Sequence, residues 1–164
     1  MRSPLKLLLD TNVLLDEYLP DRPTSKASRE LIRRAQERGD CLLYPARVIV
    51  DVHYQIAATF KAAVRAEKGV LSDADAAAIQ EIAWGCIENL EELATPVGMD
   101  VSDVWVATKY RRFNRDFEDC FIMAAAGRAQ ADYIVTSDHG LIGKSTVAAL
   151  TPDDMLALLA AEEE

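Results

Sequence analysis

The chain has 164 residues, half of them apolar, and a formal net charge of −9. This length and composition predict a single domain spanning residues 1–164 with a sizeable hydrophobic core. The acidic balance argues against a protein that coats nucleic acid through an overall positive charge. It does not argue against an enzyme that holds cations among carboxylates.

The sequence also bears on the cellular setting. No apolar run approaches the roughly 20 residues needed to cross a bilayer, so we expect no membrane partner. Residues 1–9 lack the apolar region and cleavage site of a signal peptide and instead predict a first strand. Cys41, Cys86 and Cys120 are scattered and form no CxxC pair, which predicts neither a disulfide framework nor a zinc site. A reducing cytoplasm is the expected location.

Short apolar runs alternate with stretches of helical periodicity along the chain. The predicted strands are residues 1–9, 40–45, 95–100, 132–137 and 145–151. The predicted helices are residues 25–40, 46–68, 72–93, 101–113, 117–130 and 152–161, and a turn at 19–25 separates the first of these from an earlier helix. Nearly continuous apolar strands between helices predict an α/β fold with a mostly parallel sheet.

Two of the predicted strands run out into an aspartate. Asp10 follows the apolar run LKLLL, and Asp138 follows the strand DYIVTS. In parallel sheets, functional sites gather outside the carboxyl ends of the strands. Taken singly, each aspartate also fits a turn or cap residue, because strand ends need such residues and aspartate supplies them.

More carboxylates lie in the helical segments. Asp116, Glu118 and Asp119 stand at the start of the helix at 117–130, where one acid would satisfy the preference of a helix N-terminus. Asp51 lies inside an apolar helical run, and it faces either solvent at the rim or a polar site.

Four of these acids, Asp10, Asp51, Asp119 and Asp138, are predicted to converge at one edge of the sheet. Carboxylates in one pocket repel each other, and a divalent cation removes that penalty. Mg²⁺ prefers oxygen ligands and suits a few carboxylates together with a phosphate. Two such ions would activate water and stabilise the leaving oxygen of a phosphodiester.

A basic segment directly precedes the acidic helix start. The sequence KYRRFNR interleaves aromatic side chains with four cations, Lys109, Arg111, Arg112 and Arg115. Basic and aromatic residues together can hold a single strand of RNA through phosphate contacts and stacking. The alternative is an ordinary solvated helix face with two core aromatics.

Three stretches of the sequence resemble the PIN domain family. They are LLLDTNVLLDEYLPDRP, DFEDCFIMAAAGRAQADYIVTSD and VAALTPDDML, and the similarity spans nearly the whole chain. Within the family they are most similar to the toxin ribonucleases of VapBC-type toxin–antitoxin systems. The resemblance implies a three-layer α/β/α sandwich around a parallel sheet of about five strands, and RNA cleavage that depends on Mg²⁺ or Mn²⁺.

The resemblance also assigns roles to residues. Asp10, Asp119 and Asp138 match the first, third and fourth acids of the family's metal site. Asp51 best matches the second position, where many members carry glutamate, and would act directly or through water on one or two ions. Three further residues match positions that support the ligands: Asn12, Asp116 and Thr136.

The expected function is therefore a metal-dependent endoribonuclease, the toxin of a toxin–antitoxin pair. The Ala- and Val-rich helices between residues 46 and 93 offer apolar surface for a homodimer or for an antitoxin helix. One alternative is a non-catalytic PIN-like module that binds RNA or a partner protein through an incomplete metal site. A phosphatase is disfavoured, because Asn12 stands where a DxDxT motif needs its second aspartate. A phospho-acceptor domain is disfavoured, because its paired early acids and late lysine after a strand are not evident in the sequence.

Overall fold

The computed structural model describes residues 3–163, and a parallel sheet lies at the centre of this part of the chain. Its five strands follow the order β3-β2-β1-β4-β5, and every paired neighbour is parallel. The strands are β1 (Lys6–Leu9), β2 (Cys41–Pro45), β3 (Thr95–Val97), β4 (Tyr133–Val135) and β5 (Ala149–Leu150). The predicted fold class, an α/β/α sandwich around a sheet of about five strands, is confirmed.

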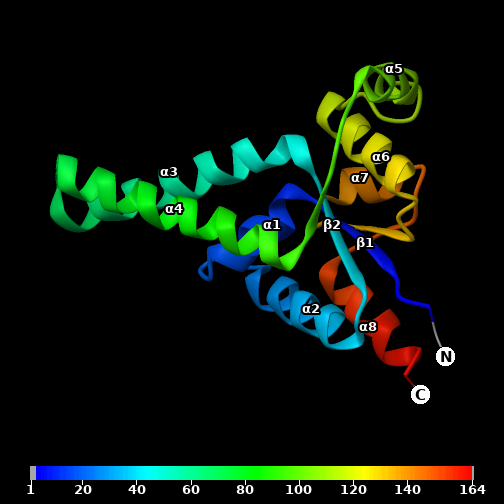
Figure 1. The fold of residues 1–164 in the computed structure, drawn as a ribbon, viewed down its shortest axis with the longest axis horizontal. Coiled ribbons are helices and arrows are strands. Elements are labelled where there is room, and N and C mark those ends of the chain that lie inside the picture. The colour runs from blue at the N-terminus through cyan, green and yellow to red at the C-terminus, as the bar shows by residue number, and fades with distance from the viewer. Residues whose placement is uncertain (1–2, 164) are drawn as a thin grey trace.

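Helices cover both faces of this sheet. The helices are α1 (Thr11–Tyr18), α2 (Ser25–Arg38), α3 (Ile49–Lys68), α4 (Asp73–Leu93), α5 (Val101–Tyr110), α6 (Phe117–Ala129), α7 (His139–Lys144) and α8 (Pro152–Ala161), with a 3₁₀ turn, η1, at Ala46–Val48. Figure 1 shows α2 and α8 together on one side of the sheet and α5 and α6 on the other.

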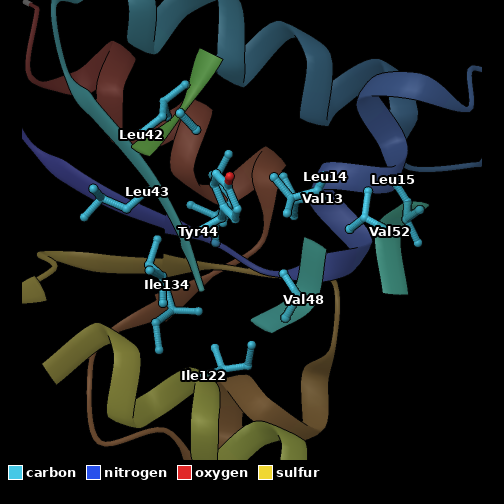
Figure 2. Close-up of a cluster of buried hydrophobic side chains, with 14 of the residues drawn as sticks. Val13, Leu14, Leu15, Leu42, Leu43, Tyr44, Val48, Val52, Ile122 and Ile134 are labelled. Atoms are coloured by element: carbon cyan, nitrogen blue, oxygen red, sulfur yellow. The ribbon is translucent and has the colours of Figure 1, made fainter. Parts of the chain in front are cut away.

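The central strand β1 explains why the N-terminal sequence is a continuous apolar run. It lies between β2 and β4, and its register pairs Leu8 with Leu43 on one side and Ile134 on the other. Because helices cover both faces, Leu7, Leu8 and Leu9 are all buried, and each contributes about 1.5–3 kcal/mol of hydrophobic stabilisation. Figure 2 shows the buried cluster, to which α1, β2, α3, α6 and β4 contribute side chains.

Helices α3 and α4 form a long antiparallel hairpin that projects from the body of the fold (Figure 1). Gly69 ends α3 with a positive φ of 79°, a conformation that glycine adopts without a steric penalty. Ser72 then starts α4 through a capping box, in which its hydroxyl accepts from the Asp75 amide. The turn between the two helices is therefore encoded locally.

Several element boundaries differ from the sequence-based prediction. Residues 1 and 2 of the predicted first strand lie outside the described residues, and β1 begins at Lys6. The predicted strand at 145–151 shortens to β5, because the Ser145 hydroxyl closes a local turn with the backbone of Val147. Helix α7 was not predicted. It forms because Asp138 accepts hydrogen bonds from the amides of Gly140 and Leu141 and so caps a new helix.

Within residues 3–163, no helix is both long and apolar enough to span a membrane.

Candidate metal centre

Asp10 occupies the turn between β1 and α1, at the carboxyl edge of the sheet. Its Oδ1 accepts from the Thr11 amide at 2.7 Å, which caps α1. Its Oδ2 accepts from the Thr136 hydroxyl at 2.7 Å and from the Asn12 side-chain amide at 3.2 Å. With 8% of its surface exposed, the carboxylate is nearly buried but well supplied with donors, as a buried charge must be.

The same network fixes the segment that carries Asp138. Thr136 Oγ1 accepts from the Asp138 amide at 3.0 Å, while Asn12 Oδ1 accepts from the Ser137 amide at 3.1 Å. Thus the side chains of Asn12 and Thr136 join the ends of β1 and β4. The predicted role of these two residues in supporting a metal site stays a prediction.

Asp119 reaches the same edge from the first turn of α6. Its backbone amide donates to Asp116 Oδ1 at 3.0 Å, so Asp116 is the N-cap of that helix. Its carboxylate accepts from Asn114 Nδ2 at 2.7 Å. Asn114 is itself buried, and its Oδ1 accepts a hydrogen bond from the Asp116 amide at 2.9 Å. It therefore orients both the turn before α6 and the Asp119 carboxylate.

These groups open onto one pocket of about 290 Å³. Its lining consists of Asp10, Thr11, Asn12, Leu15, Arg22, Gln55, Asp116, Glu118, Asp119 and Asp138. Three of the four predicted ligands, Asp10, Asp119 and Asp138, therefore share a single cavity, although they come from three separate parts of the chain.

The carboxylates affect each other's ionisation. Burial raises the pKa of Asp10, against the lowering effect of the bonds from Thr136 and Thr11, and the charges of Asp119 and Asp138 raise it further. Burial also raises the pKa of Asp119, opposed by the Asn114 bond and assisted by Asp116, Asp138 and Glu118. Both shifts reflect negative charge gathered in a partly desolvated space.

The donor set fits a hard divalent cation. All of the candidate ligands are oxygens, and the buried Thr11 hydroxyl at the pocket has no hydrogen-bond partner within the described residues. No three acidic, histidine or cysteine side chains among residues 3–163 stand together in ligand geometry. Asp138 Oδ1 caps α7, and Asp119 Oδ2 accepts a hydrogen bond from Asn114. Such an arrangement suits Mg²⁺ bound through one or two carboxylates, with water and phosphate completing the shell.

Asp51 stands apart from the other three acids. It lies in the first turn of α3 with an exposed side chain and does not line the pocket. Its charge is nevertheless one of the causes that raise the pKa of Glu118, a residue of the pocket lining. For Glu118, burial is the largest cause of the rise and Arg47 opposes it. A role for Asp51 through water stays a prediction.

The basic residues predicted to contact RNA all have exposed side chains: Lys109, Arg111, Arg112 and Arg115. They occupy the end of α5 and the turn that leads to the first turn of α6. The Lys109 ammonium lies 3.4 Å from the centre of the Trp105 ring, and the Arg112 guanidinium lies 4.5 Å from the Phe113 ring centre. Helix α5 ends at Tyr110 rather than at the predicted residue 113.

The sequence-based prediction gave no role at the site to four residues: Arg22, Gln55, Asn114 and Glu118. Glu118 belongs to the recognised acidic triplet, and Gln55 lies one turn beyond Asp51 on α3, so helical spacing was an available signal for it. Asn114 and Arg22 lie in turns, where no periodicity points to a neighbour. Only the tertiary structure brings Arg22 to the pocket and Asn114 to the Asp119 carboxylate.

The fold and the site define an α/β/α protein whose acidic side chains gather at the carboxyl edge of a parallel sheet. The family model of the PIN domain matches residues 6–140, and the chain belongs to the PIN domain family.

Solved structures show the same fold. A chain in the structure of VapBC2 from Rickettsia felis, bound to a DNA fragment from their promoter, is similar with a TM-score of 0.61 and 10% identity over 90% of this chain and 98% of that chain. PAE2754 from Pyrobaculum aerophilum is similar with a TM-score of 0.55 and 16% identity, over 97% of this chain and 99% of that chain. No curated protein matches the chain.

Proposed function

We propose that the chain is an endoribonuclease that depends on Mg²⁺ or Mn²⁺ and hydrolyses RNA phosphodiester bonds. One observation carries the proposal: Asp10, Asp119 and Asp138, far apart in the sequence, line one pocket at the carboxyl edge of the sheet. Membership of the PIN domain family supports it.

In this proposal Asp10, Asp119 and Asp138 are the ligands, one or two of them binding the ion directly and the others through water. Asp51 also acts through water. The bound cation would supply positive charge for the phosphate and lower the pKa of water beside it. The protein residues keep the ligands in place: Thr136 and Asn12 orient Asp10, and Asn114 orients Asp119. Asp116 caps the helix that carries Asp119 and so fixes its backbone.

The basic turn between α5 and α6 supports RNA as the substrate. Trp105 and Phe113 are 60% and 45% exposed, respectively, and each has a cation beside its ring. An exposed aromatic ring offers a surface on which a base stacks, while neighbouring cations contact phosphates. The turn leads directly into the first turn of α6, which carries Asp119.

The test is cleavage of a mixed pool of single-stranded and looped RNA by the native chain, with Mg²⁺, with Mn²⁺ and with EDTA. We expect cleavage only with a divalent ion, and a loss of at least about 100-fold in Asp10→Asn. Asp153→Asn is the matched control, because it removes an exposed acid of α8 that does not line the pocket. Cleavage that persists in EDTA, or that is equal in Asp10→Asn and the native chain, would contradict the proposal.

The rival function is a non-catalytic module that binds RNA or a partner protein. One observation favours it: among residues 3–163 the acids do not stand in a preassembled ligand group. The same assay separates the two, because a binding module retains RNA in the presence of Mg²⁺ without shortening it.

We further propose that the chain is a cytoplasmic toxin with an antitoxin partner, and that it forms a homodimer. The similarity in fold to a chain of VapBC2 supports the partner class. The α3–α4 hairpin supports an interface, since it exposes large apolar side chains that the sheet does not cover: Val50, Tyr54, Val70, Ile82 and Trp84. Exposed apolar groups of this kind mark interaction surfaces in soluble proteins.

A further inference from the structure

A buried aspartate forms an ion pair with an arginine of the pocket lining. Asp16 in α1 is fully buried, and its carboxylate accepts hydrogen bonds from Arg22 Nε at 2.7 Å, Thr24 Oγ1 at 2.7 Å and Ser28 Oγ. Its backbone carbonyl accepts from Ser25 Oγ at 2.7 Å. A buried charge with this many donors is compensated and rigid, because each bond offsets part of the desolvation penalty.

The arginine of this cluster faces the carboxylate pocket. Arg22 lines the pocket together with Asp10, Asp119 and Asp138, and about one third of its side chain, 34%, is exposed. Within residues 3–163, its ion pair is with Asp16 through Nε, and its terminal nitrogens bond to none of the pocket's acids. The guanidinium edge formed by the two Nη groups therefore remains available.

We infer that Arg22 binds a phosphate of the RNA substrate at the mouth of the pocket, and that Asp16 holds the guanidinium in place for this contact. The inference rests on the proposed nuclease function. An acidic pocket repels a phosphate, so a positioned cation beside the ligands favours substrate entry. Arginine suits this task because one edge of its planar fork can pair with Asp16 while the other pairs with a phosphate.

The structural alternative is that Arg22 only neutralises Asp16. The two roles predict different measurements. A neutralising arginine changes the melting temperature when it is replaced but does not change RNA affinity. An arginine that contacts phosphate changes the affinity and also its dependence on salt, because each phosphate contact releases counterions from the RNA.

Binding is measured by fluorescence anisotropy with a labelled single-stranded RNA in Mg²⁺, using Asp10→Asn as the parent so that the RNA stays intact. We expect Arg22→Gln in this parent to weaken binding at least about tenfold. We also expect it to reduce the slope of log affinity against log salt by about 0.7. Arg29→Gln is the matched control, because Arg29 is exposed on α2 and lines a different cavity. Equal losses in the two variants, or an unchanged slope in Arg22→Gln, would overturn the inference.

Arg22→Lys covers the case in which Arg22→Gln fails to fold. A lysine keeps a positive charge beside Asp16 but provides only a point charge, which cannot pair with Asp16 and a phosphate through separate edges. We expect a melting temperature close to that of the parent with affinity reduced severalfold. Parent affinity in Arg22→Lys would show that the guanidinium fork plays no part.

Cleavage assays separate this inference from the proposed function. If the native chain cleaves RNA and Arg22→Gln cleaves it with unchanged KM and kcat, the inference fails while the nuclease proposal stands. If the native chain cleaves no RNA with either ion, the nuclease proposal fails, whatever Arg22 contributes to binding.

Discussion

The Thr136 hydroxyl donates to Asp10 Oδ2 at 2.7 Å, across 126 residues of sequence, and accepts from the Asp138 amide at 3.0 Å. A single buried side chain therefore ties together two of the candidate metal ligands. This relationship exists because β1 and β4 are neighbours in the sheet, so their carboxyl ends lie at the same edge.

Replacing this hydroxyl should damage the site and the fold together. Thr136→Val removes a donor from the nearly buried Asp10 and leaves the Asp138 amide without its partner, which costs about 1–3 kcal/mol of unfolding free energy. We expect a lower melting temperature and a loss of RNA cleavage. Thr59→Val is the control, because that exposed hydroxyl only bonds to the backbone of its own helix. A Thr136→Val protein with native activity would show that the bond does not position Asp10.

Asn114 offers a test of how Asp119 is positioned. Asn114→Ala removes the donor at 2.7 Å from Asp119 Oδ2, so the carboxylate loses its fixed orientation. Groups that orient metal ligands typically contribute 10–100-fold to metal affinity. We expect the Mn²⁺ concentration for half-maximal cleavage to rise by about that factor, while Asn89→Ala, an exposed amide on α4, leaves it unchanged. An unaltered Mn²⁺ requirement in Asn114→Ala would argue that Asp119 is not a ligand.

The raised pKa values predict how stability responds to pH. Folding raises the pKa of Asp10 and Asp119 above the ordinary value of 3.8, chiefly by burial. The Asp10 and Asp119 carboxyl groups therefore bind protons more tightly in the folded protein than in the unfolded chain. Their contribution to stability is fully present below about pH 3.8 and is lost as the pH rises through the folded pKa values.

A divalent ion should reverse that loss at neutral pH. An ion at about 100 times its dissociation constant adds about 2.7 kcal/mol, which corresponds to roughly 5–10 °C in melting temperature. We expect such a shift with Mg²⁺ or Mn²⁺ at about pH 7.5 and a smaller shift in acid, because protons there compete with the ion for the Asp10 and Asp119 carboxylates, whose pKa values are raised. Asp119→Asn should melt higher than the native chain in EDTA at neutral pH and respond less to the ion. A native chain whose melting is insensitive to both ions would contradict this.

Gly140 tests the position of the Asp138 carboxylate. A Cβ atom added at Gly140 would lie 3.0 Å from Asp138 Oδ1, closer than ordinary van der Waals contact. Alanine favours a helix over glycine by about 1 kcal/mol, so Gly140→Ala should lower cleavage much more than stability. Gly143→Ala in the same helix meets no atom within 4 Å and should keep full activity. Equal activity in the two variants would show that Asp138 tolerates displacement.

The exposed face of the α3–α4 hairpin tests the proposed homodimer. Tyr54 and Trp84 are 70% and 57% exposed, so glutamate at both positions should leave the fold intact and disrupt an apolar interface. We expect light scattering to give a dimer for the native chain and a monomer for the double variant. Val101→Glu, at an exposed position on α5, should remain dimeric. A native chain that is monomeric at micromolar concentration would exclude this interface as a dimer contact.

Local pattern predicted much of the architecture but placed some boundaries wrongly. Two patterns were predicted correctly: the apolar run before Asp10 and the helical periodicity of 46–68 and 72–93. Both arise from residues close together in the sequence, so the sequence alone reveals them. Helix α7 escaped prediction because it is six residues long, too short to establish a period. Asp138 was correctly placed at a strand end, yet its capping of a new helix was not foreseen.

The sequence by itself determined the alternation of strands and helices, the acids at the strand ends and the motifs of the PIN domain family, because each of these is written in contiguous residues. Only the tertiary structure decided that β1 lies beside β4, that Arg22 lines the pocket and that Asn114 bonds to Asp119. It also decided that Asp51 is exposed and does not line the pocket. Those placements depend on the order of strands and on contacts between turns, and neither leaves a periodic signal in the chain.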